Sequence, residues 1–310
     1  MPRWPELPQW NAASMRRLIR IGIALGGLGL GVFWLVTTPQ PRAMAAYAGL
    51  TGDKVHGALV FRAAGCASCH MAAKAEGAAQ LVLAGGQSFA TAFGTFLAPN
   101  ISPDPAAGIG GWSLADFVHA VQDGITPKGQ HEFPAMPYLA YARMVPQDVV
   151  DLKAFMDMLP PSATASLPQQ VGFPFNIRRN LGGWKLLFGA QAYVLQGDLA
   201  PEVARGRYIA EAMAHCGECH TPRNALGGLD KSKWLGGAPL PDGKGKTPNI
   251  TPGKLDWSAD EIFLYLTTGF KPDFDVVAGP MAHVVDNMAG LPPKDVRAVV
   301  AYLKAVAAVP

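Results

Sequence analysis

Two short stretches, GCASCH at residues 65–70 and HCGECH at residues 215–220, contain all four cysteines of this 310-residue chain. Both follow the pattern C-x-x-C-H, which is typical of covalent attachment of c-type haem. Each thiol can form a thioether with a haem vinyl group, and the adjacent histidine can bind the iron. The pattern therefore predicts two covalently bound haem c groups. The predicted ligands are the cysteines and histidine of each motif: Cys66, Cys69 and His70, and Cys216, Cys219 and His220.

Two other uses of paired cysteines fit this chain less well. A structural zinc site takes four ligands, usually with a second pair close by, but the first cysteines of these pairs, at residues 66 and 216, are 150 positions apart. A thioredoxin-like dithiol needs no following histidine and lies in a βαβ pattern, which neither copy shows. Because the haem motifs use all four cysteines, none remains for a disulfide or as an iron ligand.

The composition is that of a globular protein with packed cores. Apolar residues make up 49% and charged residues 16% of the chain, and the formal net charge is +3. The length suits two domains of ordinary size with additional segments. A net charge this small argues against nucleic acid as a partner, and the propionates of two haems would lower it further.

An apolar run of 16 residues, Ile21–Val36, follows a leader with three arginines within residues 16–20. With its flanking residues, a helix over this run is just long enough to cross a membrane. We therefore expect a membrane anchor over residues 18–38. Because arginines precede the run, residues 1–17 are expected on the cytoplasmic side and the rest of the chain in the periplasm.

The same run can instead be the apolar core of a signal peptide. Ala43 and Ala45 form an A-x-A site, so cleavage after Ala45 is the alternative. The site lies far beyond the apolar run and the polar leader is long, which favours an uncleaved anchor in the bacterial inner membrane. Both interpretations place the two haem motifs in the periplasm, where haem is attached to exported chains.

The two halves of the chain repeat the same landmarks in the same order. PNISPDPAAGIGGWS follows the first haem motif and PNITPGKLDWS the second, so Asn100 and Trp112 correspond to Asn249 and Trp257. In each half the W-S pair opens a helix-like segment, with the serine as its expected N-cap.

Each half is also bounded by two helix candidates. The first precedes the haem motif (GDKVHGALVFRAAG and APEVARGRYIAEAMA), and the second closes the half after a proline (PQDVVDLKAFMDML and PPKDVRAVVAYLKAV). Apolar residues recur there at spacings of three and four, the helical period. No segment shows sustained alternation, so we expect little sheet.

These landmarks predict a mainly α fold with two tandem class I cytochrome c domains behind an N-terminal transmembrane helix. The expected divisions after the anchor are a tether at 39–50, cytochrome c domain 1 at 51–160, an ordered linker at 161–198 and cytochrome c domain 2 at 199–310.

The repeat also predicts the second axial ligand of each iron. An electron-transfer haem commonly has methionine opposite the histidine. Met136 lies 24 residues after Trp112, and Met281 lies 24 residues after Trp257, in the proline-containing stretches FPAMPY and AGPMAH. We therefore predict that Met136 and Met281 are the distal ligands.

Other side chains compete for this role. Met144 and Met288 lie nearby, but neither coincides with a methionine when the halves are superimposed, and a single methionine is more commonly core filler. His131 and His283 lie near the ligand loops and are the histidine alternatives.

Asn100, Asn249, Trp112 and Trp257 are further haem-binding candidates. Haem propionates at a domain edge need hydrogen-bond donors, which an asparagine amide or an indole N–H can supply. The alternative is structural: each tryptophan is a core residue and each asparagine a turn residue.

The stretch between the two halves, residues 161–198, is long and apolar for a flexible tether. Phe173, Phe175, Trp184 and Leu187 would be costly to leave in water. We therefore expect this linker to pack across both domains and to hold the two haems within tunnelling distance. The alternative is a partner-binding or membrane-facing segment.

Several stretches together resemble one family. PNISPDPAAGIGGWSLADFVHAVQDG, FPAMPYLAYARM, GFPFNIRRNLGGWKLLF, GRYIAEAMAHCGECHTPRNALGG and GPMAHVVDN resemble cytochrome c subunits of membrane-bound bacterial dehydrogenases. The resemblance covers roughly residues 50–310. Those subunits are partners of quinoprotein alcohol dehydrogenases and of flavoprotein gluconate and sorbitol dehydrogenases. Well-known members carry three haem domains, whereas this sequence has two haem motifs.

The resemblance implies a haem-binding protein that is not itself an enzyme. We expect it to transfer electrons from a periplasmic dehydrogenase catalytic subunit to a respiratory acceptor, which is a quinone, a cytochrome or an oxidase. The family's iron ligands carry over onto His70 with Met136 and onto His220 with Met281.

Three alternatives remain open at this stage. A dihaem peroxidase needs an open distal site, which two methionine ligands oppose, and a thiosulfate-type oxidoreductase uses a cysteine ligand that this chain lacks. A dihaem subunit of a haem–copper oxidase also has an N-terminal anchor, but it matches these sequence details less well.

Overall fold

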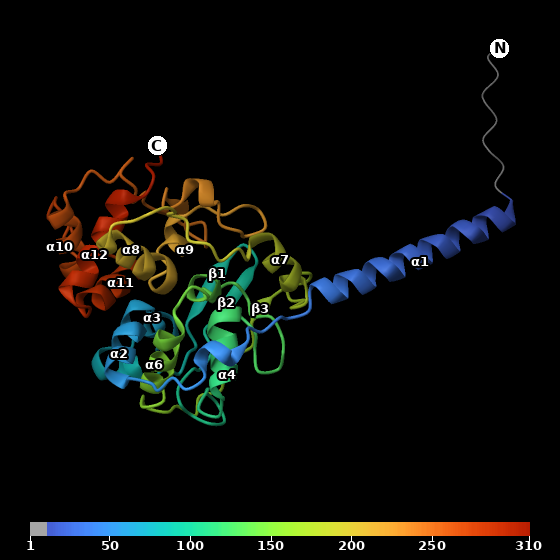
Figure 1. Ribbon diagram of the computed structural model, residues 1–310, viewed down its shortest axis with the longest axis horizontal. Helices are drawn as coiled ribbons and strands as arrows, with labels where there is room; N and C mark the ends of the chain where they lie inside the picture. Colours follow the sequence, from blue (N-terminus) through green and yellow to red (C-terminus); the bar gives the residue numbers. More distant parts are fainter. Residues whose placement is uncertain (1–10) are drawn as a thin grey trace, which may run out of the picture. The chain divides into compact units, whose positions relative to one another are not determined.

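The computed structural model describes residues 11–310 and is mainly helical (Figure 1). The part of the chain from Pro39 to Pro310 is one compact unit, and the residues up to Thr38 form another. Residues 1–10, most of the expected cytoplasmic segment, lie outside the described residues.

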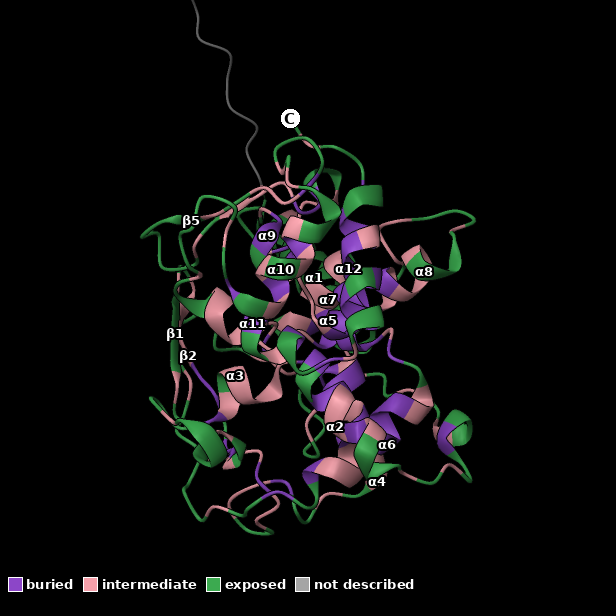
Figure 2. Cartoon of the chain, turned by 90° about the vertical axis from the view of Figure 1, so that its left-hand side faces the viewer, coloured by how far each residue is buried: buried purple, intermediate pink, exposed green. Residues whose placement is uncertain are grey.

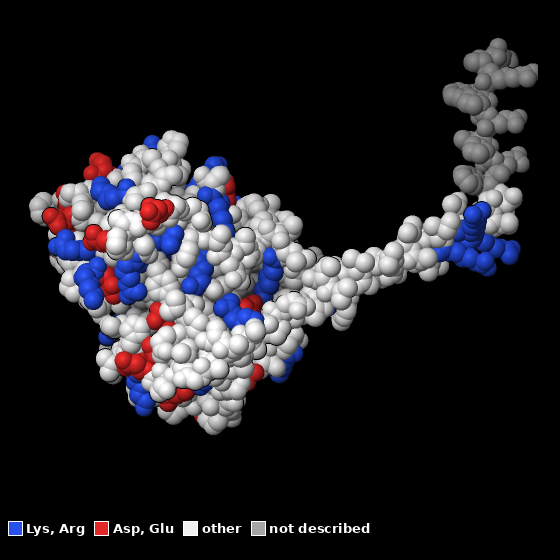
Figure 3. All heavy atoms as spheres, in the orientation of Figure 1, with Lys and Arg blue, Asp and Glu red and all other residues white. Residues whose placement is uncertain are grey.

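The N-terminal unit consists of helix α1, Ala12–Val36. Asn11 caps it by accepting a 2.8 Å hydrogen bond from the backbone N–H of Ser14. None of its residues is buried. Its most apolar 18-residue window has a mean hydropathy of 1.9, so the helix is long and apolar enough to cross a membrane. Lys and Arg atoms gather at its N-terminal end (Figure 3).

The first repeat is built on two helices that cross closely, α2 (Lys54–Ala63) and α6 (Pro146–Met156). Gly57 makes the crossing possible, because a Cβ atom there would lie 2.0 Å from the carbonyl oxygen of Asp151. The other helical elements of this repeat are α3 (Cys66–His70), α4 (Leu114–Val118), the π-helical turn η3 (His119–Asp123) and α5 (Tyr138–Tyr141).

The second repeat has the same crossing. Helix α8 (Pro201–Arg207) continues as the π-helical turn η4 (Tyr208–Met213) and packs on α12 (Pro293–Ala305). A Cβ atom at Gly206 would lie 1.8 Å from the carbonyl oxygen of Ala298. The other helices are α9 (Gly217–His220), α10 (Ala259–Thr268) and α11 (Pro280–Ala289).

The expected N-caps are confirmed. Ser113 and Ser258 each accept a hydrogen bond from the backbone N–H three residues on, and an acidic side chain there, Asp116 or Glu261, bonds back to the serine N–H. This capping box satisfies donors that the first helical turn would otherwise leave unpaired.

Sheet is scarce in the described residues, as expected. Strands β1 (Ser88–Thr91), β2 (Gly94–Leu97) and β3 (Gln170–Val171) form one small antiparallel sheet. Strands β4 (Ala238–Pro239) and β5 (Lys246–Thr247) pair as another. Short 3₁₀ turns complete the described elements: η1 (Met44–Tyr47), η2 (Gly77–Leu81) and η5 (Lys231–Lys233).

The two repeats share one hydrophobic core. The buried cluster includes Phe61 and Val149 from the first repeat and Ile209 and Val299 from the second, and buried residues run through the helices of both (Figure 2). The Tyr208 hydroxyl donates to the Asp148 carboxylate (2.5 Å) and accepts from the Val145 N–H (3.1 Å). The repeats are therefore packed together rather than merely tethered.

Residues 161–198 contact both repeats. At one end, Gln169 bonds both the N–H and the carbonyl of Leu97, and β3 pairs with β2. Helix α7 (Asn180–Phe188) follows, and the Trp184 indole donates to the Leu226 carbonyl at 2.9 Å. At the other end, Glu211 accepts from the N–H groups of residues 194 and 195.

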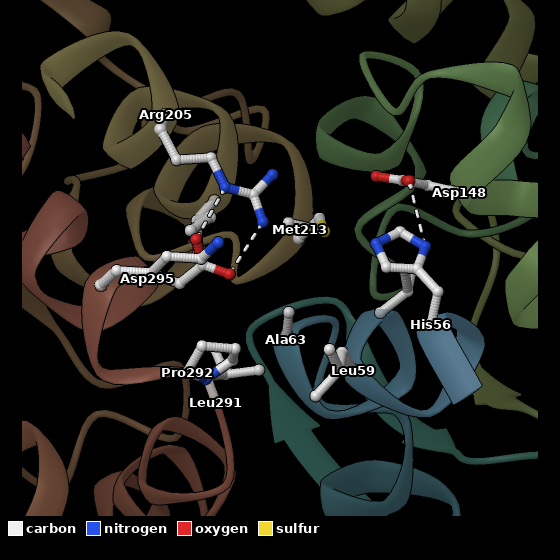
Figure 4. Close-up of a pocket in the computed structure, with 12 residues that line it drawn as sticks. His56, Leu59, Ala63, Asp148, Arg205, Met213, Leu291, Pro292 and Asp295 are labelled. Atoms are coloured by element: carbon white, nitrogen blue, oxygen red, sulfur yellow. Dashed lines mark hydrogen bonds and ion pairs between the residues drawn. The ribbon is translucent and has the colours of Figure 1, made fainter. Parts of the chain in front are cut away.

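A cavity of about 250 Å³ lies between the repeats (Figure 4). Arg205 makes a two-point ion pair with Asp295 (3.0 and 2.9 Å) on one side. On the other side His56 bonds Asp151 (2.8 Å) and lies 3.7 Å from Asp148. None of the predicted iron ligands lines this cavity. Its charged side chains instead form ion pairs and hydrogen bonds on the two sides of the contact between the repeats.

Candidate functional site

The histidines of the two motifs are held in the same way. The Nδ1 atom of His70 lies 2.9 Å from the carbonyl oxygen of Pro99, and that of His220 lies 2.8 Å from the carbonyl oxygen of Pro248. Burial lowers the pKa of both imidazoles, with the proline carbonyls opposing. A neutral ring that donates from Nδ1 presents the lone pair of Nε2, which is the arrangement of a metal-binding histidine.

None of the four cysteines, all of which the structure describes, forms a disulfide. Burial raises the pKa of Cys66 and of Cys216 to about 12 and that of Cys69 to about 11, and it also raises the pKa of Cys219. Each motif places two thiols beside one oriented imidazole, which is the donor set of a covalently bound haem c.

The two predicted distal methionines lie in the loop regions that the repeat indicates. The Met136 N–H donates to Phe133 (3.1 Å) and the Met136 carbonyl accepts from Tyr138 (2.8 Å), which fixes a turn just before α5. Met281 is the second residue of α11, after Pro280. Both methionines are only partly buried. Their ligand role stays a prediction that this placement supports.

The competing methionines are core residues. Met144 is 3% exposed and Met288 is 2% exposed, and both belong to the shared hydrophobic cluster. Among the histidines, His56 bonds Asp151 and His119 lies 3.2 Å from the Arg42 carbonyl. His131 and His283 lie in the segments that carry the predicted methionines, so they stay the histidine alternatives.

Asn100 fastens the start of the linker. Its amide donates to the carbonyls of Ser162 (2.7 Å) and Thr164 (2.8 Å), and its carbonyl oxygen accepts from the Ser102 N–H. These contacts fit the structural alternative for Asn100, and its propionate role stays a prediction.

Asn249 makes the corresponding contact in the second repeat. Its amide donates to the Val309 carbonyl at 2.9 Å, and its oxygen accepts from Thr251. Trp112 and Trp257 are partly buried, and the Trp257 ring lies edge-on to Tyr265 at 5.3 Å. The structural alternative thus describes all three residues, and their propionate role stays a prediction.

The two haem motifs lie next to each other, although they are 150 residues apart in sequence. The side-chain nitrogen of Asn287, in the second repeat, would lie 3.4 Å from a Cβ atom at Gly65, the residue just before the first motif. Asn287 of α11 donates to the Ser68 hydroxyl inside the first motif at 3.0 Å. Each motif is thus in contact with the opposite repeat.

A shared carbonyl also joins the segments that lead into the motifs. The Tyr141 hydroxyl donates to the carbonyl of Ala64 at 2.8 Å, and the His215 ring bonds the same oxygen. The two rings lie edge to face at 5.7 Å. The sequence did not predict these contacts. Aligning the two halves finds residues that occur in both, whereas Tyr141 and His215 each occur in only one half.

Comparisons with known proteins agree with this geometry. Residues 55–160 match the family described as Cytochrome c. A protein of Cereibacter sphaeroides described as diheme cytochrome c-type is 54% identical over 299 residues, which are 95% of this chain and 100% of that protein. The chain belongs to the dihaem c-type cytochromes.

The dihaem cytochrome is also related to cytochrome subunits of dehydrogenases. A fructose dehydrogenase cytochrome subunit of Gluconobacter japonicus is 39% identical over 79% of this chain and 51% of that subunit. The cytochrome c subunit of an alcohol dehydrogenase (quinone) of Gluconobacter oxydans is 35% identical over 82% of this chain and 55% of that subunit. The dihaem cytochrome spans about half the length of these two subunits.

A buried carboxylate distinguishes the second haem site of the dihaem cytochrome. Glu211 is 1% exposed and accepts from the Tyr302 hydroxyl at 2.8 Å, and that hydroxyl accepts from the Trp234 indole at 2.7 Å. Glu211 lies five residues before Cys216, whereas Phe61 lies five residues before Cys66. The two haem sites therefore differ in charge, and this difference can be read by aligning the motifs.

Proposed function

We propose that this dihaem cytochrome is an electron-transfer subunit that accepts electrons from a periplasmic dehydrogenase catalytic subunit and passes them to the respiratory chain. The observation that carries the proposal is the relation to dehydrogenase cytochrome subunits, which extends over about four-fifths of the chain and includes both repeats. When bound, each haem supplies a one-electron Fe(III)/Fe(II) couple.

In this proposal the two repeats are tandem class I cytochrome c domains, at 51–160 and 199–310. The matching crossings at Gly57 and Gly206 and the matching histidine–proline hydrogen bonds support this division. Met136 and Met281 complete the iron ligands, because they are the partly buried methionines at corresponding places in the two repeats.

The chain's own residues position the two sites. The Pro99 and Pro248 carbonyls orient the imidazoles, while Asn287, Tyr141 and His215 hold the motifs against each other. Because these contacts are short hydrogen bonds within one core, the spacing between the sites is fixed. A fixed short spacing suits electron transfer, whose rate falls steeply with distance.

We further propose that α1 is an uncleaved anchor in the inner membrane, with both haem domains in the periplasm. Cleavage after Ala45 would remove Arg42, whose N–H and Nε bond the Asp123 carboxylate at 2.9 and 2.8 Å. It would also cut within η1, beside Tyr47, which is 4% exposed and bonded to Gln122. The folded unit thus begins upstream of the candidate cleavage site.

The test is reduction in the native membrane. The full chain carries a C-terminal tag, membranes are solubilised gently, and the c-type α-band is followed after addition of D-fructose, ethanol or D-gluconate, each alone. We expect a dehydrogenase to co-purify and one substrate class to reduce both haems. If dithionite reduces the haems but no dehydrogenase co-purifies and no substrate acts, the proposal is wrong. A high-spin ferric signal from one haem in low-temperature EPR would favour a peroxidase instead.

A further inference from the structure

Large apolar side chains are exposed together on the linker and α7. We name this set the linker face, and its members are Phe173 (81% exposed), Phe175 (47%), Ile177 (41%), Leu186 (65%) and Leu187 (69%). Water-exposed apolar residues are common singly, but a group within 15 residues of sequence marks an interaction site.

Side-chain contacts connect Phe175 of the linker face to the second repeat. The Phe175 ring packs edge-on against Phe93 at 5.1 Å. Phe93 in turn lies against Gly227, beside Leu226, which is 58% exposed and bonded to Trp184 of α7. The apolar surface therefore continues from the linker onto the second repeat.

The linker face is a firm platform rather than a loose loop. Lys185 of α7 donates from Nζ to the carbonyls of Asp123 (2.6 Å) and Gly124 (2.9 Å). Gly228 packs against the Phe188 ring, because a Cβ atom there would lie 2.3 Å from it. With its polar and aromatic sides engaged, α7 leaves Leu186 and Leu187 to the outside.

If α1 stays attached, a short tether joins the membrane to the part of the unit that contacts α7. Arg42 bonds the carboxylate of Asp123, the residue whose carbonyl binds Lys185 of α7. Arg42 lies four positions after Thr38, which follows the end of α1, and an extended chain spans at most about 14 Å over that length. The tether is therefore short whatever the direction of α1.

The charge of the segment is also compatible with a lipid surface. Residues 158–197 contain no Asp or Glu, and they include Arg178, Arg179 and Lys185. Of these, Arg178 pairs with Glu132 at 3.4 Å, and Lys185 is turned toward the Asp123 and Gly124 carbonyls. Figure 3 shows uncharged atoms where Figure 1 labels α7, with Lys or Arg atoms beside them. Apolar side chains flanked by cations are typical of segments that lie in the interface of anionic membranes.

We propose that the linker face rests on the periplasmic surface of the membrane and fixes the orientation of both haem domains above it. The occupant is the lipid bilayer, and the inference rests on the proposed anchor. The contact holds the unit 39–310 in one pose, so that the same side always faces away from the lipid.

Modification of single introduced cysteines in the full chain, by formation of a mixed disulfide, tests this directly. The four native thiols are consumed by the haems, so an introduced cysteine is the single reactive thiol. Phe173→Cys and Leu187→Cys are compared with Val55→Cys (79% exposed) and Phe274→Cys (93% exposed) as matched controls elsewhere on the unit. Each holoprotein is placed in nanodiscs of phosphatidylethanolamine and phosphatidylglycerol and treated with a charged, water-soluble thiosulfonate. Each rate is divided by that of the same variant in urea.

We expect the normalised rates at 173 and 187 to be at least tenfold lower than those at 55 and 274. Equal rates at all four positions would overturn the proposal. The rates at 173 and 187 could instead be fast in nanodiscs and slow only in native membranes that contain a co-purifying dehydrogenase. That result would assign the linker face to the dehydrogenase and would also overturn the proposal. An N-terminus after Ala45 in mass spectrometry of the purified protein would remove its basis. None of these outcomes depends on substrate reduction, so failure here is separable from failure of the proposed function.

Discussion

The helix crossings make a quantitative prediction for Gly57→Ala. The new methyl carbon would lie 2.0 Å from the Asp151 carbonyl oxygen, whereas a normal C···O contact is about 3.3 Å. Backbone atoms form both sides of the contact, so α2 and α6 must separate by about 1 Å. Overpacking of this severity costs about 3 kcal/mol, and the better helix propensity of alanine offsets about 1 kcal/mol. We expect a net loss of about 2 kcal/mol.

The repeat supplies a second test, and the linker supplies the control. Gly206→Ala should cost about as much, because its Cβ would lie 1.8 Å from the Ala298 carbonyl oxygen. Gly172→Ala should be nearly neutral, because no atom lies within 4 Å of its Cβ position. For a domain of this size a loss of 2 kcal/mol lowers Tm by about 4–8 °C.

The assay is urea and thermal unfolding of the purified holoprotein, followed by far-UV circular dichroism. Because the two glycines lie in different helix pairs, we expect the double variant to lose about 4 kcal/mol. If Gly57→Ala stays within about 0.5 kcal/mol of Gly172→Ala, the close crossing is not what stabilises the repeat, and the reasoning is refuted.

The remaining predictions concern the haem sites and pH. Met136→Ala should convert one of the two haems to a high-spin ferric form in EPR. The control Met144→Ala should leave the EPR spectrum unchanged and lower the free energy of unfolding by about 2–5 kcal/mol. An unaltered spectrum in Met136→Ala would exclude Met136 as a ligand. Glu211→Gln should raise the midpoint potential of the second haem by the equivalent of roughly 1 kcal/mol, because a nearby negative charge stabilises the ferric form. A redox titration in which neither midpoint potential changes would contradict this prediction. Burial alone would raise the pKa of Asp151, but hydrogen bonds from the Asp53 N–H, from His56 and from Gln147 lower it overall. The stabilisation from ionised Asp151 is therefore complete above the unfolded carboxyl pKa of about 3.9 and is lost as pH falls through the lower pKa of the folded state. In acid unfolding, wild type should thus lose more stability than Asp151→Asn. Identical acid unfolding curves for the two proteins would contradict this prediction.

The helices and the haem motifs could be predicted because each rests on local signals. Ser113 and Ser258 are capped helix starts that spacing alone reveals, and the C-x-x-C-H pattern defines its own chemistry. Aligning the two halves also indicates the candidate distal ligands, because Met136 and Met281 each lie 24 residues after the corresponding tryptophan.

The remainder depends on contacts between distant residues. The use of Asn100 could not be predicted, because its partners lie more than 60 positions away in the linker. Asn287 meets Ser68 only because the repeats pack together. The helix expected over 200–214 is also divided, with η4 following α8, and no residue preference distinguishes a π-helical turn from an ordinary one.

The packing of each motif region against the opposite repeat has a consequence for stoichiometry. Oxidation of an alcohol or an aldose by a dehydrogenase releases electrons in pairs, while each iron accepts one. A subunit with two neighbouring one-electron sites can take up both electrons before it meets its own acceptor. Under the proposed function, the duplication gives a single polypeptide room for both electrons of one turnover of such a dehydrogenase.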